Sequence, residues 1–364
     1  MKIAYITHNY KPYIGGVMYV MEQVAVEISK KHDVEVNTLV PLHSSLPKTE
    51  KSDGYVIKRF LGLSPSNSYY VPTFSFLKAL IKLKADVVHV HVVASLVPLA
   101  IWIVKKFNPK WKLLVLTPHF HNEGFSKHSN FAWIFYRPIL KKIIGSFDII
   151  HSISPNEAQL IHEKWGVTPI LIPHGISEDV LSYEWRPPRK FTVVYSGTLR
   201  KYKGVDLLIK AMSLINKRNS EARLLIIGSG EYKTKLVKMA KQLNANVTFL
   251  SPMQRNDYLK TLAECSVMGY LSESEAFCIT VLEAIAVGLP VVAVKPWGSF
   301  FEKYNKTKIL PSNPSPEKVS DALTSFDFKT FPPKNVIPTW SKIAEMYEKL
   351  YSQNLQRCRL KKRQ

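Results

Sequence analysis

The stretch 270-YLSESEAFCITVLEAIAVGLPVVAV-294 carries two acids, Glu275 and Glu283, where the chain turns from polar to apolar. A Gly-x-Pro step at Gly288 interrupts the apolar run, and a short segment with the composition of a buried strand follows. The order strand, polar loop, helix, turn and strand is typical of a βαβ unit. We therefore expect Glu275 in the loop before a helix and Glu283 about two turns inside it, at roughly 3.6 residues per turn.

This arrangement predicts a site for a ligand in which hydroxyl groups flank a phosphate. The free backbone N–H groups at a helix N-terminus bind anions, and phosphate is the usual one. Carboxylates repel a phosphate, but they accept hydrogen bonds from hydroxyl groups on either side of it. A ligand with hydroxyls, a phosphate and further hydroxyls is a nucleotide sugar, so this class of compound is the predicted ligand.

Strands and helices alternate along the rest of the chain, which predicts an α/β fold with doubly wound parallel sheets. The alternation covers residues 1–170, stops in a proline-rich stretch at 171–190, and restarts over 191–335. We interpret these parts as an N-terminal Rossmann-like domain, a linker and a C-terminal Rossmann-like domain, followed by a helix and a basic tail over 336–364. Two such domains in tandem predict a central cleft at the carboxyl ends of the strands.

The composition restricts the compartment and the partners. The 364 residues have a net charge of +22, from 50 Lys and Arg against 28 Asp and Glu. This favours a polyanionic partner, although an organism with lysine-rich proteins would give the same bias. The three cysteines have no paired spacing, which is typical of a reducing compartment. The N-terminus reads as a strand and not as a signal peptide, and the longest apolar stretch, Val92–Val104, is too short to span a membrane. We expect a cytoplasmic protein.

Taken in order, the motifs resemble those of the GT-B-fold, nucleotide-sugar-dependent glycosyltransferases of the retaining family 4, or glycosyl transferases group 1, over nearly the whole chain. In that family an acid-Gly-Phe-Gly loop precedes a helix with a second acid; here Ala276 and Cys278 replace the two glycines. The resemblance implies that Glu275 holds hydroxyls of the transferred sugar and Glu283 the ribose hydroxyls. The backbone N–H groups that it directs to the donor are those of Phe277, Cys278 and Ile279.

A second motif, 195-YSGTLRKYKGVDLLI-209, follows a predicted strand and enters a predicted helix. The resemblance assigns Lys203 to the donor diphosphate, where a cation stabilises the leaving group. Thr198 stands where the family has arginine, and Arg200 or Lys201 is the candidate second cation. The predicted donor-binding set further contains Thr198, Arg200, Gly15, Gly16, Gly228, Gly230, Ser251 and Met253.

The first predicted domain supplies His119, from the segment 115-VLTPHFH-121 at the end of a strand. The resemblance places it beside the reacting sugar, with His121 as a weaker candidate. His119, Lys203 and Glu275 are thus the predicted catalytic residues. The resemblance also implies that the C-terminal helix returns to the first domain, and that the reaction needs neither a metal nor a cofactor.

Residues 105–142 carry eight Lys or Arg against one acid, with aromatic residues between them. The segment 131-FAWIFYRPILKKII-144 is typical of a basic, aromatic helix on a membrane, and an ordinary packed helix is the alternative. The expected partners are a nucleotide-sugar donor and a glycan or polyprenyl-phosphate-linked acceptor, with an anionic surface on the inner face of the cell membrane as a candidate. Nucleic acid is not expected, because no recognised binding module is present.

Two other functions remain open at this point. A nucleotide-sugar epimerase shares the two-domain architecture but usually needs further carboxylates near the sugar. A catalytically silent partner protein of the same fold, docked on a membrane, would explain the departures at Thr198, Ala276 and Cys278.

Overall fold

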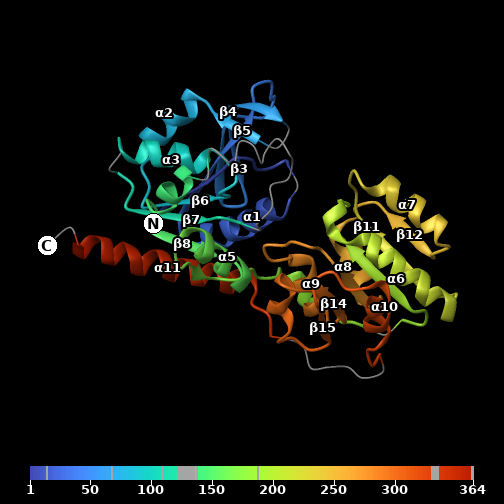
Figure 1. The fold of residues 1–364 in the computed structure, drawn as a ribbon. Coiled ribbons are helices and arrows are strands. Elements are labelled where there is room, and N and C mark those ends of the chain that lie inside the picture. Colours follow the sequence, from blue (N-terminus) through green and yellow to red (C-terminus); the bar gives the residue numbers. More distant parts are fainter. Residues whose placement is uncertain are drawn as a thin grey trace. The chain divides into compact units, whose positions relative to one another are not determined.

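The computed structural model describes residues 1–13, 15–66, 69–107, 110–120, 136, 138–186, 188–328 and 336–361. The chain divides into two compact units. Unit 1 consists of Met1–His174 and the segment that begins at Trp340, and unit 2 is Gly175–Thr339. Each unit has its own sheet with helices packed on it (Figure 1).

The sheet of unit 1, as far as the structure describes it, has the strand order β3-β4-β2-β1-β6-β7-β8-β9, and β5 pairs with β4. Its strands are β1 (Lys2–Thr7), β2 (Asp33–Pro41), β3 (Thr49–Ser52), β4 (Tyr55–Ser66), β5 (Tyr69–Pro72), β6 (Val87–His91), β7 (Leu113–Thr117), β8 (Ile149–Ser152) and β9 (Ile170–Leu171). Its helices are α1 (Gly16–Ser29), α2 (Phe74–Lys82), α3 (Val97–Lys105), α5 (Pro155–Trp165) and α11 (Trp340–Lys361). All of β6 is buried, because helices cover both faces of a parallel sheet.

The region between β2 and α2 differs from the prediction. Residues 44–75 are expected to form a variable loop around one strand, YVIKRF, but β4 is twice that length and pairs antiparallel with β3 and β5. The β3–β4 hairpin turns at Asp53 and Gly54, both with positive φ. Asp-Gly is a strong two-residue hairpin signal, so this turn could have been read from the sequence.

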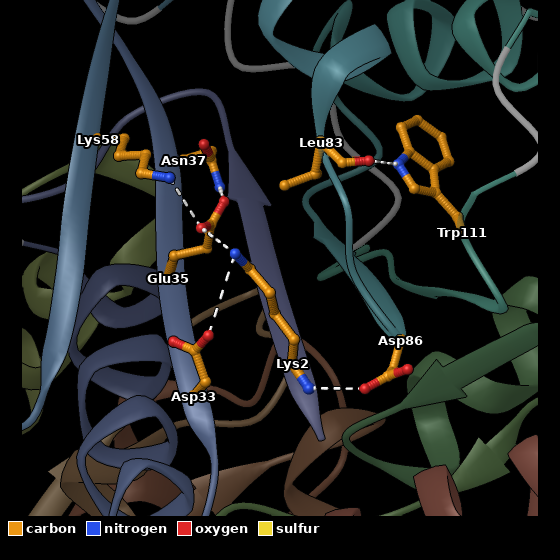
Figure 2. A network of polar contacts seen from close by, with 8 residues as sticks. All are labelled: Lys2, Asp33, Glu35, Asn37, Lys58, Leu83, Asp86 and Trp111. Atoms are coloured by element: carbon orange, nitrogen blue, oxygen red, sulfur yellow. Dashed lines mark hydrogen bonds and ion pairs between the residues drawn. The ribbon is translucent and has the colours of Figure 1, made fainter.

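A polar network lies at the amino ends of β1, β2 and β6 (Figure 2). Glu35 is buried there and accepts hydrogen bonds from Lys58 Nζ at 2.8 Å and Asn37 Nδ2 at 2.9 Å, while Lys2 Nζ lies 3.5 Å away. Burial alone would raise the pKa of Glu35, but these contacts hold it below its usual value. The Lys2 backbone N–H donates to Asp86 at 2.8 Å, which ties β1 to the start of β6.

Unit 2 has a parallel sheet of order β12-β11-β10-β13-β14-β15 among its described residues. The strands are β10 (Thr192–Ser196), β11 (Arg223–Ile227), β12 (Val247–Leu250), β13 (Val267–Tyr270), β14 (Val291–Val294) and β15 (Thr307–Leu310). The helices are α6 (Val205–Arg218), α7 (Lys233–Gln242), α8 (Arg255–Ala263), α9 (Ile279–Val287) and α10 (Pro316–Thr324), with 3₁₀ turns η1 (Glu178–Ser182), η2 (Lys201–Lys203) and η3 (Trp297–Phe301). Of these, β15 and α10 are absent from the sequence prediction.

The predicted linker, 171–190, is only in part a connection between units. The division falls after His174, and the residues from Gly175 onward pack with unit 2. Trp185 is buried: its backbone N–H donates to Val287 and its indole N–H donates to Cys265, each at 2.8 Å. A large aromatic side chain therefore anchors this proline-rich stretch, which composition alone does not reveal.

Candidate functional site

Three loops meet at the carboxyl edge of the sheet in unit 2, after β10, β11 and β13. Their backbones are hydrogen-bonded to one another. The Leu199 N–H donates to Ser229 at 2.9 Å, Tyr232 donates to Leu199 at 3.0 Å, and Glu273 donates to Tyr202 at 2.8 Å. The three loops therefore form one rigid platform, as expected where parallel strands end together.

Glycines make this platform possible. A Cβ atom on Gly204, whose φ is +69°, would lie 2.2 Å from the carbonyl oxygen of Leu271. A Cβ on Gly228 would lie 2.0 Å from the oxygen of Gly197, and one on Gly230 would lie 2.3 Å from that of Leu199. Gly228 and Gly230, predicted to bind the donor, thus have a structural role in loop packing.

The platform brings Lys203 and Glu275 into contact, although they are 72 positions apart in sequence. Lys203 Nζ lies 2.5 Å from Glu275 Oε1, and the two side chains are only 10% and 13% exposed. Burial alone would lower the pKa of Lys203, but Glu275 raises it above its usual value, so the ammonium stays charged. The rings of Tyr202 and Tyr270 also lie within 5.0 and 5.9 Å of this ammonium.

The N-terminus of α9 follows directly after Glu275. Cys278 is its N-cap residue with φ of +86°, in the left-handed region that favours glycine. This explains why glycine is usual at this position in the family that the sequence resembles. Burial raises the pKa of the Cys278 thiol, so the side chain is neutral. Phe277 is buried against Phe301, and neither a side-chain cap nor an acid occupies the first turn of α9. The first N–H groups, including that of Ile279, are thus suited to an anion.

Glu283 lies about one turn inside α9 and not two as predicted, because the helix begins only at Ile279. It is also paired with a cation. It is 4% exposed, and Arg255 Nη1 of α8 lies 2.5 Å from its Oε1. Arg255 in turn contacts Asp179 of η1, with Nε 2.9 Å from Oδ2. Sequence reasoning missed Arg255 and Asp179, because no motif marks them and the pairing depends on how three separate elements pack.

The other predicted donor-binding residues of unit 2 lie on the loops after β10 and β12. Thr198 and Arg200 are exposed on the loop after β10. Ser251 is exposed after β12, and Met253 is half-buried with its sulfur 3.8 Å from the Thr261 hydroxyl.

Unit 1 contains the remaining predicted residues. Gly15 is the N-cap of α1 and Gly16 is its first residue, where a Cβ would meet no neighbour. His119 follows β7 with φ of +49°, and its Nε2 lies 3.0 Å from Nδ1 of His91. His91 is not among the predicted site residues, although its ring is hydrogen-bonded to that of His119 and stacks on it. His121 lies outside the described residues.

Further histidines lie next to this pair in a buried hydrogen-bond chain. His89 is 2.7 Å from both Tyr351 Oη and Thr117 Oγ1, and Thr117 Oγ1 is 2.7 Å from His151. His151 also approaches the carbonyl oxygen of Ile172 at 2.9 Å. Burial lowers the pKa of His89 well below 6.5 and that of His151 to about 4, so both rings are neutral at physiological pH.

The models of two protein families match the chain. "Glycosyltransferase Family 4" matches residues 14–180, and "Glycosyl transferases group 1" matches residues 184–326. Together they cover most of both units, so the chain belongs to the group 1 glycosyltransferases, as the motifs predict. Among the described helices, none has the length and apolar character needed to cross a bilayer.

Named relatives match over part of their length. A GDP-mannose-dependent monoacylated alpha-(1-6)-phosphatidylinositol monomannoside mannosyltransferase of Corynebacterium glutamicum is 28% identical over 58% of this chain and 59% of its own. One component of the human phosphatidylinositol N-acetylglucosaminyltransferase is 27% identical over 50% of this chain and 40% of its own. The chain spans about half the length of the curated relatives that it matches.

Solved structures share the fold over nearly the whole chain. Sucrose-phosphate synthase from Thermosynechococcus elongatus superposes with a TM-score of 0.70 at 17% identity, over 97% of this chain and 99% of its own. HepE of Anabaena, in a crystal structure with UDP-glucose, gives 0.70 at 16% identity, over 98% of this chain and 95% of its own. These likenesses establish the predicted GT-B fold.

The loop platform should not tolerate a side chain at Gly204. We expect Gly204→Ala to lower the free energy of unfolding of unit 2 by more than about 2 kcal/mol, because Cβ meets a backbone oxygen. Gly288→Ala is the matched control: φ is +96°, but the nearest atom to a Cβ lies 3.5 Å away, so only the backbone strain of about 1 kcal/mol remains. Thermal unfolding of both variants measures the difference, and equal losses would contradict this account.

The buried histidines should make unit 1 sensitive to acid. In the unfolded chain they bind protons near pH 6.5, whereas folded His151 does so only near pH 4. The contribution of these neutral histidines to the free energy of unfolding is therefore fully present above about pH 6.5 and is lost as the pH falls toward 4. For His151 alone this loss is about 3 kcal/mol. We expect His151→Gln to reduce the fall in melting temperature between about pH 6.5 and pH 4. His162→Gln, on the exposed side of α5, should leave the curve unchanged; equal curves for all three proteins would refute the assignment.

Proposed function

We propose that the protein transfers a sugar from a nucleotide diphosphate sugar to a lipid-linked or glycan acceptor, with retention of the anomeric configuration and without a metal ion. The observation that carries the proposal is the Lys203–Glu275 pair beside the N-terminus of α9. A cation, a carboxylate and free helix N–H groups in one place match a diphosphate with sugar hydroxyls next to it.

Each residue has a separate role in this proposal. Lys203 and the first N–H groups of α9 stabilise the charge that develops on the leaving diphosphate. Glu275 accepts hydrogen bonds from hydroxyls of the transferred sugar, and Glu283 accepts them from the ribose. The role of His119, on unit 1, is taken from the resemblance to the family: it donates a hydrogen bond to a sugar hydroxyl.

The relatives support the two substrate classes. The names of matched proteins include GDP-mannose and UDP-N-acetylglucosamine, and HepE was solved with UDP-glucose, which favours a nucleotide-sugar donor. Both relatives described above have phosphatidylinositol in their names, which favours a lipid acceptor. Because the matching family consists of glycosyltransferases, transfer is favoured over epimerisation. The intact Lys203–Glu275 pair argues against a silent partner protein.

Removing either member of the pair should abolish turnover. We expect Lys203→Ala and Glu275→Ala each to lower the rate of release of nucleoside diphosphate by about a hundredfold or more, since each contacts the part of the donor where charge develops. The assay is a panel of UDP- and GDP-sugars with phosphate-coupled detection. Glu273→Ala and Lys210→Ala are matched controls, because both side chains are exposed, the first on the loop after β13 and the second on α6. Similar rates in all four variants would contradict the proposal.

A lipid-linked acceptor requires access to a membrane, and α2 and α3 of unit 1 offer a suitable surface. Phe74 and Phe107 are 79% and 69% exposed there, and Ile81 and Ile103 are exposed as well. The exposed lysines of the same segment are Lys78, Lys82, Lys84, Lys105 and Lys106. The helices lie side by side (Figure 1), so these exposed apolar and basic residues belong to neighbouring elements. This combination fits an anionic bilayer. Of the predicted helix 131–144, residues 131–135 and 137 lie outside the described residues. In the described part, Leu140, Ile143 and Ile144 are buried in the core of unit 1, as expected for the packed-helix alternative.

Charge reversal on α2 should release the protein from anionic vesicles. We expect the double variant Lys78→Glu/Lys82→Glu to lose most co-sedimentation with vesicles of one part phosphatidylglycerol to two parts phosphatidylcholine at low salt, because each lysine contributes about 1 kcal/mol. Lys238→Glu/Lys241→Glu on α7 makes the same change in net charge on unit 2 and should bind normally. Failure of the wild-type protein to bind would refute the membrane surface.

A further inference from the structure

Glu283 is a buried carboxylate, and burying a charged group costs free energy unless a cation or hydrogen-bond donors are paired with it. It is 4% exposed, and its neighbours on α9 are apolar. Burial disfavours the charged form and raises the pKa of Glu283, whereas Arg255 acts in the opposite direction. The ionised form, which accepts hydrogen bonds with both oxygens, therefore depends on the guanidinium beside it.

Arg255 is itself held in a defined orientation. Its Nε and Nη2 lie 2.9 and 3.3 Å from the two oxygens of Asp179, while Nη1 points to Glu283 at 2.5 Å. The planar guanidinium thus bridges a carboxylate on η1 and another on α9, in the fork geometry that lysine cannot reproduce. Because Arg255 contacts Oε1 of Glu283, acceptor capacity remains on this carboxylate for other donors.

The other ionisable groups near Glu283 come from the elements packed against α9. Tyr258 of α8 lies beside it with a buried hydroxyl, whose pKa is raised by burial and by Glu283. Asp179 acts against the charge of Glu283 from η1. On β13, Tyr270 lies closer to Cys278 and Glu275. Arg255 is the cation in this set, and it favours the ionised form of Glu283 more than the Tyr258 hydroxyl does.

We propose that Arg255, anchored by Asp179, is a positioning residue that keeps Glu283 ionised and oriented to accept hydrogen bonds from the ribose hydroxyls of the donor nucleotide. This inference rests on the proposed function. It assigns a preference for ribonucleotides over 2′-deoxyribonucleotides to a relay of three residues, Asp179, Arg255 and Glu283. The relay acts on the nucleoside end of the donor only, since Lys203 and α9 bind the diphosphate.

The test compares nucleotides with and without the 2′-hydroxyl. Isothermal titration calorimetry measures affinity for UDP against 2′-deoxy-UDP, and for GDP against 2′-deoxy-GDP, at about pH 7 and about pH 9. For whichever of UDP and GDP binds more tightly, we expect the wild-type protein to bind the ribonucleotide about tenfold or more tightly than its 2′-deoxy form at both pH values. The 2′-deoxy form lacks a hydrogen bond to a charged acceptor. Inorganic pyrophosphate, which has no ribose, reports on the diphosphate site alone.

Arg255→Met should reduce this preference to about threefold or less near pH 7, because loss of the guanidinium raises the pKa of Glu283 further and favours its neutral form; the preference should increase with pH. Arg255→Lys keeps a cation but loses the fork, so its preference should be reduced equally at both pH values. Glu283→Gln should lose the preference at both. Pyrophosphate affinity should stay within about threefold of wild type throughout, whereas a collapsed site would lose it.

Arg218→Met is the matched control, because Arg218 also pairs with an aspartate, Asp321 at 3.7 Å, on the exposed surface of unit 2. It should behave as wild type. An unchanged ribose preference in Arg255→Met near pH 7 overturns the inference while leaving the proposed function intact. Equal affinity of the wild-type protein for ribo- and deoxyribonucleotides, or no nucleotide binding, overturns the ribose role of Glu283 and the inference with it.

Discussion

The close approach of Gly204 to the carbonyl oxygen of Leu271 is the contact on which the rest of the candidate site depends. With no side chain at Gly204, the loop after β10 lies directly on the loop after β13. Lys203 immediately precedes Gly204, and Glu275 follows Leu271 by four positions. The contact between the two loops therefore brings the cation to the carboxylate. The same platform ends at the N-terminus of α9. One backbone approach therefore organises the charged groups and the helix N–H groups together.

The cations of the candidate site are paired with carboxylates before any ligand binds. Glu275 is paired with Lys203, and Glu283 is paired with Arg255. Such pairs offset part of the cost of burying charge, and they hold each side chain in place. A donor that brings its own negative charges meets cations already fixed by carboxylates, so little reorganisation is needed when it binds. The two acids differ in their surroundings, because Glu275 lies in a loop and Glu283 lies within a helix.

Much of this arrangement could be predicted from the sequence, for a topological reason. Parallel strands place their following loops at one edge, so Lys203 after β10 and Glu275 after β13 were bound to be neighbours. Arg255 and Asp179 could not be found in this way, because they are 76 positions apart and meet only through the packing of α8 and η1. The antiparallel strands β3 and β5 interrupt the alternation of strands and helices on which the prediction rests; of the two, only β3 has a sequence signal, the Asp53-Gly54 turn.

The histidine chain of unit 1 depends on a part of the protein that is far away in sequence. Tyr347 and Tyr351 of α11 are buried, and the Tyr351 hydroxyl lies 2.7 Å from His89 of β6 and 3.4 Å from Tyr5 of β1. Unit 1 therefore begins at the first strand and is completed only by the C-terminal helix. During synthesis on the ribosome, all of unit 2 emerges before α11 does. The first unit to be translated is thus the last to finish folding, and its partly formed core must persist without aggregation until that helix arrives.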